Sequence, residues 1–300
     1  GETANSCRLE ECLLKASDMI GWKEKGMRTV MPDGKIRARG VAMAMQGSSI
    51  SNCDVGSVTV KLSDEGTYHI TVGCTDMGTG CDTIIAQFAA DVLETPIDNI
   101  SVYGVDTDIS PYDSGSYASS TTYLTGMAAV KACEQLRERI IALAAVRMNK
   151  DASALTFDGE NVIDESDGAK MSLFDIATAS MCNNEISLEV TYSHSSPVSP
   201  PPFMAACAEI EADPETGAIE LLDYTACVDC GTVVNTNLAR VQTEGGLLQG
   251  IGMTLYEDIW YDERGKNLSN SFMQYKVPSR LDTDRIRVEF DSSYEPTGPF

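Results

Sequence analysis

Residues 72–83 contain the residue types and spacing needed to hold a polar ligand close to the backbone. An apolar alternation ends at Val72, and the sequence then continues through Met77, Gly78, Thr79 and Gly80 into a helical pattern. Glycines at these positions let the chain turn tightly and bring its N–H groups near a polar or anionic group. Because short glycine patterns are common, a plain connection between a strand and a helix is the alternative.

A second candidate is a run of four hydroxyl residues that follows a long polar loop at 104–117. Ser119, Ser120, Thr121 and Thr122 lie at the start of the longest predicted helix, which continues to about residue 149. Hydroxyls beside the unpaired N–H groups of a helix N-terminus suit a phosphate or an oxyanion. The alternative is that they only cap the helix.

A third candidate is a predicted helix near the C-terminus that carries Gly245, Gly246, Gly250 and Gly252. Each interior glycine costs about 1 kcal/mol relative to alanine, so the four together would cost roughly 3 to 4 kcal/mol. We expect another surface to approach this helix closely, either a neighbouring backbone or a bulky cofactor.

Other chemistries find little support in the sequence. Cys227 and Cys230 form a lone C-x-x-C motif, and His69 and His194 are the two histidines of the chain. A zinc cluster or a histidine-based triad therefore has few residues to draw on, and we assign no metal ligands. The ten cysteines are scattered through apolar segments, which indicates buried thiols and a cytoplasmic location.

Composition restricts the partners. The 300 residues include 43% hydrophobic and 22% charged residues, as in a globular protein, and carry a formal net charge of −23. Such a charge repels a phosphate backbone, so nucleic acid is not an expected partner. The sequence has neither an apolar run long enough to cross a membrane nor a signal-peptide pattern, so no membrane association is expected.

The periodicity predicts an α+β protein with two lobes. The first, residues 1–199, holds a helix at 7–21 capped by Ser6, a strand at 37–46, and a hairpin, loop and helix between residues 57 and 94. A proline-rich stretch at 193–202 marks the boundary. The second lobe, residues 200–300, repeats the order of hairpin, loop and helix, which indicates a duplicated unit.

Several of these motifs together resemble one family. Met77-Gly78-Thr79-Gly80 is followed by Gln87, by Asp106-Thr107-Asp108, by Ala118-Ser119 and by the segment from Gln242 to Gly252, all in register. In this order they resemble the C-terminal half of the molybdopterin-binding part of the molybdenum hydroxylases, the xanthine dehydrogenase and aldehyde oxidase family. The similarity extends from about residue 37 to residue 300.

The resemblance implies a molybdopterin site, in the simple or the cytosine dinucleotide form. Met77, Gly78 and Thr79 would lie along the cofactor, and Gln242 would reach the pterin from the second lobe. The pterin and its phosphate would be held by Ala118, Ser119, Ser120, Thr121 and Thr122. Family members hydroxylate N-heterocycles such as purines, or aldehydes, with oxygen from water. Iron–sulfur clusters and FAD would be carried on other domains or subunits, and the other half of the molybdenum-binding subunit would be a partner.

The sequence also departs from the family pattern. Thr79 stands where the family usually has glutamine, Tyr117 replaces a small residue and Ser120 a larger one. The family's catalytic glutamate is expected beyond Phe300, so we assign no catalytic residue and expect the isolated chain to be inactive. The competing hypothesis is a non-catalytic binding or assembly module that keeps the fold without the cofactor.

Overall fold

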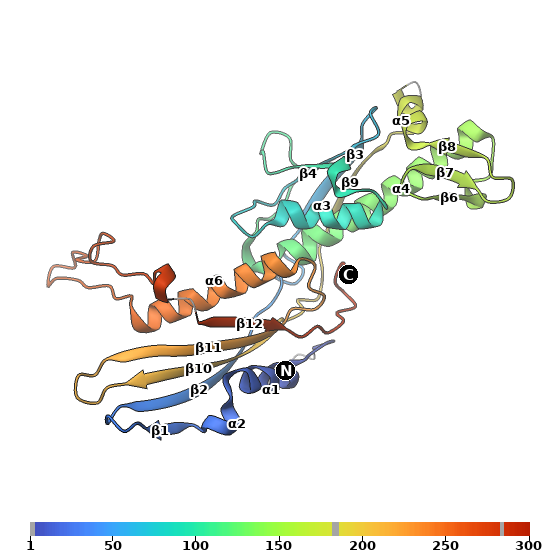
Figure 1. Cartoon of the computed structure of the whole chain (residues 1–300). Helices are drawn as coiled ribbons and strands as arrows, with labels where there is room; N and C mark the ends of the chain where they lie inside the picture. Colours follow the sequence, from blue (N-terminus) through green and yellow to red (C-terminus); the bar gives the residue numbers. More distant parts are fainter. Residues whose placement is uncertain (1–3, 182–185, 283–284) are drawn as a thin grey trace. The chain divides into compact units, whose positions relative to one another are not determined.

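The computed structural model describes residues 4–181, 186–282 and 285–300 (Figure 1). The chain forms two compact units: unit 1 combines Gly1–Gln46 with Pro201–Glu295, and unit 2 combines Gly47–Pro200 with Pro296–Phe300. This division corrects the predicted lobes 1–199 and 200–300, because the first 46 residues pack with the C-terminal part of the chain.

Strand pairing explains the regrouping in unit 1. Its five-stranded sheet has the order β1-β2-β10-β11-β12, and β2 pairs antiparallel with β10 from Ile36 opposite Ala212 to Met45 opposite Phe203. The strands are β1 (Arg28–Val30), β2 (Ile36–Met45), β10 (Phe203–Ala212), β11 (Ile219–Asp229) and β12 (Ile286–Phe290). A full ladder of backbone hydrogen bonds therefore fixes the N-terminal segment to the C-terminal hairpin.

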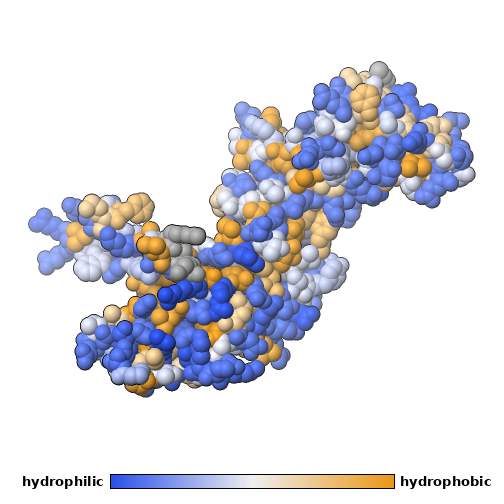
Figure 2. Space-filling view, viewed as in Figure 1, coloured by the Kyte–Doolittle hydropathy of each residue, from blue (hydrophilic) through white to orange (hydrophobic). Residues whose placement is uncertain are grey.

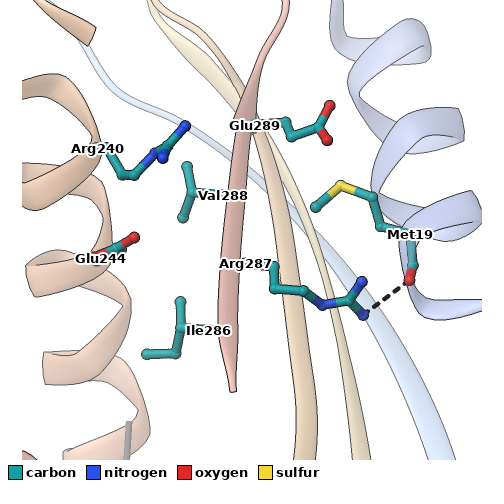
Figure 3. A pocket seen from close by; sticks show the side chains of 7 residues that line it. All are labelled: Met19, Arg240, Glu244, Ile286, Arg287, Val288 and Glu289. Atoms are coloured by element: carbon teal, nitrogen blue, oxygen red, sulfur yellow. Dashed lines mark hydrogen bonds between the residues drawn. The ribbon is translucent and has the colours of Figure 1, made fainter. Parts of the chain in front are cut away.

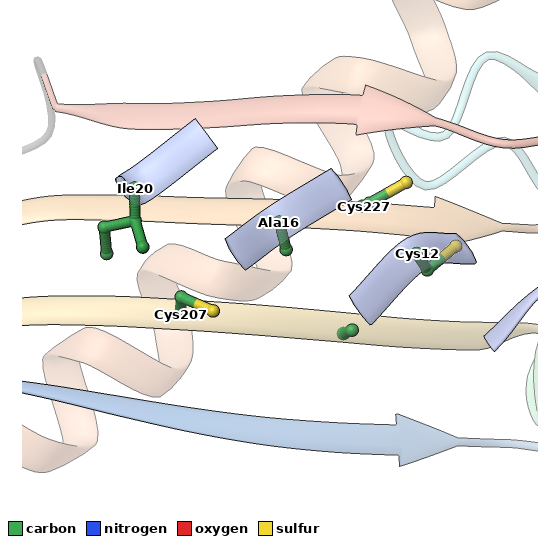
Figure 4. Packing of buried hydrophobic residues seen from close by; sticks show 6 residues of the cluster. Cys12, Ala16, Ile20, Cys207 and Cys227 are labelled. Atoms are coloured by element: carbon green, nitrogen blue, oxygen red, sulfur yellow. The ribbon is translucent and has the colours of Figure 1, made fainter. Parts of the chain in front are cut away.

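Helices cover both faces of this sheet because alternate strand residues point to opposite sides. On one face, α1 (Leu9–Ile20) packs Cys12, Ala16 and Ile20 against Ala205, Cys207 and Cys227 (Figure 4). On the other, Leu247 of α6 (Thr236–Leu255) packs with Ala206, Ala226 and Val288. The short helices α2 (Trp22–Lys25) and η5 (Arg280–Asp282) complete the unit.

The predicted first helix is present, but its start differs from the expectation. Its N-cap residue is Arg8, without a side-chain cap, and the Arg8 N–H donates to Asp229 Oδ2 at 2.8 Å. Ser6, the predicted cap, donates instead to Glu295 at 3.2 Å. The helix ends as expected, at Gly21 in the left-handed conformation.

A buried ion pair crosses from β2 to β10 in unit 1. Arg39 donates to Glu209 at 2.5 Å, and Lys25 also contacts Glu209, at 2.8 Å. Burial raises the pKa of the Glu209 carboxyl, but the hydrogen bonds and charges of Lys25 and Arg39 outweigh burial and leave that pKa below its usual value.

Unit 2 has a four-stranded sheet with the order β5-β4-β3-β9. The strands are β3 (Gly56–Leu62), β4 (Tyr68–Val72), β5 (Ile100–Tyr103) and β9 (Glu189–His194). Helices α3 (Cys81–Val92) and α4 (Gly126–Met148) pack against it, α3 on β5 and α4 on β3 and β9. A small sheet and its neighbours follow: η4 (Ala152–Ala154), β6 (Leu155–Phe157), β7 (Asn161–Asp164), β8 (Lys170–Ser172) and α5 (Leu173–Met181).

The predicted order of hairpin, loop and helix is found in both units. In unit 1 the antiparallel pair β10 and β11 leads through α6 to β12, which lies parallel to β11. In unit 2 the antiparallel pair β3 and β4 leads through α3 to β5, which lies parallel to β4. Each unit thus places a loop and a helix start after the second strand of its hairpin.

Two glycines allow close packing in unit 2. A Cβ at Gly126 would lie 2.5 Å from the ring of Phe88, and one at Gly56 would lie 2.5 Å from the backbone nitrogen of Thr125. Phe88 also stacks on Phe300, with ring centroids 5.0 Å apart. None of the helices in the described part of the chain combines the length and apolarity needed to span a membrane.

Candidate functional site

The loop between β4 and α3 is held in shape by one carboxylate. Asp76 Oδ1 accepts the N–H groups of Gly78 at 2.9 Å and Gly80 at 3.1 Å. Burial raises the pKa of Asp76, but these backbone hydrogen bonds outweigh it and leave the pKa below its usual value. Gly78 and Gly80 adopt φ of 97° and 78°, which glycine adopts without strain. The loop therefore keeps its turn without help from a ligand.

The residues of this loop that the sequence singled out are exposed or partly exposed to solvent. Met77 is 64% exposed, Gly78 is also exposed and Thr79 is partly exposed, and a Cβ at Gly78 would have no neighbour within 4 Å. Where the loop enters α3, burial raises the pKa of the Asp82 carboxyl, and the nearby charge of Asp76 raises it further. The tip of the loop is thus open to a ligand on its outer side.

The sequence suggested that the second predicted segment, residues 119–122, begins the long α-helix, but in the structure it lies before that helix. A 3₁₀ turn, η2 (Tyr117–Ser119), and a π turn, η3 (Thr121–Thr125), come first, and α4 starts at Gly126. Ala118 and Ser119 have φ of 53° and 56°, the left-handed region that non-glycine residues rarely adopt. Two such residues cost of order 1–3 kcal/mol each, and such strain clusters at ligand sites. π turns likewise occur often at functional sites.

The four hydroxyls do not all face the same way. Ser120 is buried and donates inward to the carbonyls of Tyr117 at 3.0 Å and Gly115 at 3.4 Å. Ser119 and Thr122 are exposed and Thr121 is partly exposed. No side-chain cap forms at the starts of η3 and α4, which disfavours a role restricted to capping.

Two contacts bring the two segments together within unit 2. Ser116 Oγ accepts the N–H of Thr75 at 3.1 Å and donates to the Thr75 carbonyl at 3.0 Å. Gly73 lies against the loop 104–117, and a Cβ there would come within 2.5 Å of the Pro111 carbonyl and of the Asp113 side chain. The glycine loop and the hydroxyl segment therefore form one surface.

Asp113 anchors this surface to the sheet. Its Oδ2 accepts the N–H of Ser57 at 3.3 Å and the hydroxyl of Thr125 at 3.1 Å, and its Oδ1 accepts the N–H of Gly115 at 2.8 Å. Sequence reasoning gave no role to Asp113 or Ser116. Two features of the sequence could have pointed to them: Ser116 is a hydroxyl residue just before the hydroxyl run, and Gly73 lacks a side chain where the loop 104–117 packs closely against it.

The remaining predicted residue, Gln242, lies in unit 1 on the exposed side of α6. Gly245, Gly246 and Gly250 have no described atom within 4 Å of a Cβ, whereas one at Gly252 would lie 2.9 Å from Pro278. Among the described residues, the expected close approach to this helix is therefore found at Gly252 and not at the other three glycines.

The segment after α6, residues 256–281, also exposes large apolar side chains. Trp260, Phe272, Met273 and Leu281 are among them, and hydrophobic atoms are visible at its surface in Figure 2.

A separate shallow pocket of about 350 Å³ lies beside β12 in unit 1 (Figure 3). Arg240 and Glu244 of α6 line it with Arg287 and Glu289 of β12, and Arg287 donates to the Met19 carbonyl at 2.8 Å. Its charges are balanced in sign, and it contains none of the predicted site residues. We therefore place the candidate site at the glycine loop and hydroxyl segment.

The family model described as molybdopterin cofactor-binding domain matches residues 15–284. The chain is 35% identical to a probable hypoxanthine oxidase of Escherichia coli K12 over 99% of the chain and 31% of that protein. It is 27% identical to a putative xanthine dehydrogenase molybdenum-binding subunit of the same organism, covering 41% of it.

Solved structures give the same picture. The Cu,Mo-dependent CO dehydrogenase matches the whole chain with a TM-score of 0.86 and 25% identity, over 40% of its own chain. Quinoline 2-oxidoreductase from Pseudomonas putida 86 has a TM-score of 0.87 at 23% identity, which shows a shared fold. The chain thus spans well under half the length of each of these relatives.

Proposed function

Because the chain belongs to the molybdopterin cofactor-binding domain of the xanthine dehydrogenase, CO dehydrogenase and aldehyde oxidoreductase family, we propose that it holds the cofactor of a hydroxylase. It is an oxidoreductase domain of the molybdenum hydroxylase type and corresponds to part of the large subunits of its relatives. The reaction is the hydroxylation of a carbon in an N-heterocycle such as a purine, or in an aldehyde, with water as the oxygen source.

The observation that carries this proposal is the joined surface of the glycine loop and the hydroxyl segment. The exposed Met77 and Gly78 and the partly exposed Thr79 lie on a loop whose turn is already fixed by Asp76. Ser116 ties that loop to the segment in which Ala118 and Ser119 hold a strained backbone. A preorganised polar surface with open space at Gly78 fits a flat, hydrogen-bonding group with a phosphate.

When bound, the molybdenum cofactor supplies the two-electron redox chemistry. Met77, Gly78 and Thr79 position it from one side. Ala118, Ser119, Thr121 and Thr122 hold the pterin and its phosphate through backbone and hydroxyl groups, and Gln242 contacts the pterin from unit 1. Ser120 contributes by bracing the segment from inside, since its hydroxyl is already bonded to Tyr117 and Gly115.

The wider assembly follows from the same proposal. Iron–sulfur clusters and FAD would be carried on other domains or subunits and would supply the electron-accepting chemistry, and the other half of the molybdenum-binding subunit would complete the site. One relative is named as the gamma subunit of a 6-hydroxypseudooxynicotine dehydrogenase complex, which supports a multisubunit assembly. The names of the hypoxanthine oxidase and xanthine dehydrogenase relatives favour an N-heterocycle over an aldehyde as substrate.

A second candidate function is a binding or assembly module that keeps the fold without the cofactor. Thr79 favours it, because this short side chain replaces the glutamine that usually reaches toward the metal's ligands. The exposed Ser119 and Thr122 favour the catalytic proposal.

The test is turnover by the full-length protein purified natively with its partner subunits. We expect it to oxidise a purine and to incorporate ¹⁸O from labelled water into the product. A matched Thr79→Gln variant should remain active, because it restores the usual family residue. Failure of both proteins to oxidise purines, other N-heterocycles and aldehydes would support the module instead.

A further inference from the structure

Four groups of metal-ligand type meet where the glycine loop leaves β4 and enters α3. Cys74 lies two residues after β4, Cys81 is the first residue of α3, and Asp76 and Asp82 lie beside them. One ligand atom from each of Asp76, Cys81 and Asp82 lies within 4.8 Å of the other two. Cys74 Sγ lies 4.0 Å from Cys81 Sγ, and Cys81 Sγ lies 3.6 Å from Asp82 Oδ1.

Two of these separations, Cys74 to Cys81 and Cys81 to Asp82, are close to the edges of a tetrahedral zinc site. With Zn–S distances of about 2.3 Å and Zn–O distances of about 2.0 Å, two sulfurs lie about 3.8 Å apart and a sulfur and an oxygen about 3.5 Å apart. These two distances exceed the ideal values by about 0.1 to 0.2 Å. The ligand atoms that lie within 4.8 Å of one another belong to Asp76, Cys81 and Asp82, so the Cys74 side chain would have to move toward the two carboxylates to complete the site.

Burial and charge also suit a soft divalent cation. Cys74 and Cys81 are buried, whereas Asp82 is partly exposed and Asp76 is exposed, so sulfur faces the interior and oxygen faces solvent. Asp76 and Asp82 place two negative charges close together, and a cation between them relieves the repulsion. Thiolate sulfur favours Zn²⁺ over Mg²⁺ or Ca²⁺, which prefer oxygen ligands.

We propose that Cys74, Cys81, Asp82 and Asp76 bind one Zn²⁺ that ties the two ends of the glycine loop together. Binding replaces the two thiol protons, which pass to solvent, with two Zn–S bonds, and no oxidation takes place. The ion closes the loop at its base and leaves Met77, Gly78 and Thr79 at the exposed tip. This inference concerns the support of the loop and does not depend on which ligand the loop holds.

The test uses the full-length protein, stripped of loosely held metal by a chelator and reloaded with Zn²⁺ or Co²⁺. We expect Co²⁺ to produce thiolate-to-metal charge-transfer absorption in the near ultraviolet. Cys74→Ser and Cys81→Ser should abolish this absorption and lower the zinc content by one equivalent per chain. The matched control is Cys207→Ser, which removes a buried thiol from β10 in unit 1 and should change neither reading.

A further variant covers the case in which a serine variant does not fold. Cys81→His keeps a zinc ligand but removes one thiolate, so zinc should stay bound while the charge-transfer intensity falls by about half. Zinc content and cobalt spectra in the two serine variants equal to those of the Cys207→Ser control would overturn the proposal. A Cys74–Cys81 disulfide in the natively purified protein, detected by mass spectrometry without reductant, would overturn it too.

Discussion

The contact between Gly56 and the π turn gives a sharp prediction for Gly56→Ala. The new Cβ would lie 2.5 Å from the nitrogen and 2.6 Å from the Cα of Thr125. Carbon atoms in contact normally stay about 3.5 Å apart or more, so the overlap is about 1 Å. The obstructing atoms are backbone, which cannot move aside as the end of a side chain can. The cost should reach the upper end of the range for overpacking, about 3 kcal/mol.

Alanine also stabilises the fold by about 0.4–1 kcal/mol, because it restricts the conformations of the unfolded chain more than glycine does. The net effect is a destabilisation of about 2 kcal/mol, or roughly a thirtyfold change in the unfolding equilibrium. For a unit of this size, the melting temperature should fall by about 4–8 °C. Thr125 lies three residues after Thr122, so the variant should also displace the hydroxyl segment.

The matched control is Gly40→Ala, which makes the same substitution in strand β2. A Cβ at Gly40 has no neighbour within 4 Å, so this variant should be neutral or stabilising by up to about 1 kcal/mol. Both variants can be compared by urea and thermal denaturation. Equal stability of the two would refute the close approach of β3 and the π turn, and with it our account of how the hydroxyl segment is positioned.

Three further predictions address the ion pair, the loop and the isolated chain. The pKa of Glu209 is lowered, and the hydrogen bonds that Asp164 makes with Ser166 and Lys150 lower its pKa to about 2. Both carboxylates therefore stabilise the fold at pH values above their unfolded pKa values. The free energy of unfolding, measured by urea titration, should therefore be steady from pH 7 to about pH 5 and should decrease at pH values below about 4.5. The difference in free energy of unfolding between wild type and Glu209→Gln should shrink over the same pH range. Ser116→Ala should cost about 1–2 kcal/mol and speed amide hydrogen exchange in residues 73–80, whereas Ser153→Ala, which removes an exposed hydroxyl in the same unit, should leave that exchange unchanged. The isolated chain should contain no stoichiometric molybdenum and hydroxylate no heterocycle, because a cofactor held from two halves loses much of its contact area when one is missing; metal analysis and turnover assays check this.

Local patterns predicted much of the fold. The alternation at Val58, Val60 and Leu62 and at Ile70 and Val72 placed the hairpin of unit 2, and Gly21 marked the end of the first helix. The pairing of β2 with β10 could not be predicted in this way, because strand partners distant in sequence leave no trace in local periodicity. The predicted lobe boundary consequently assigned residues 1–46 to the wrong unit.

The candidate site was predicted by residue type but not by orientation. Glycine spacing identified the loop at Met77 and Thr79, and the hydroxyl run identified the segment beside it. Periodicity cannot show that Ser120 turns inward, because the π turn before Gly126 changes the angle between successive side chains. The hydrogen bonds between Ser116 and Thr75 could not be predicted either, because they join residues 41 positions apart and local periodicity carries no information on such contacts.

The central claim is that the glycine loop and the hydroxyl segment hold a molybdopterin cofactor. The most direct measurement is the molybdenum and pterin content of the full-length protein purified natively, compared with Thr122→Val and with Thr29→Val, a control that removes an exposed hydroxyl from β1 in unit 1. We predict about one molybdenum and one pterin per chain in wild type and in Thr29→Val, and a lower content in Thr122→Val. A folded full-length protein without molybdenum or pterin, or equal occupancy in all three proteins, would contradict the assignment.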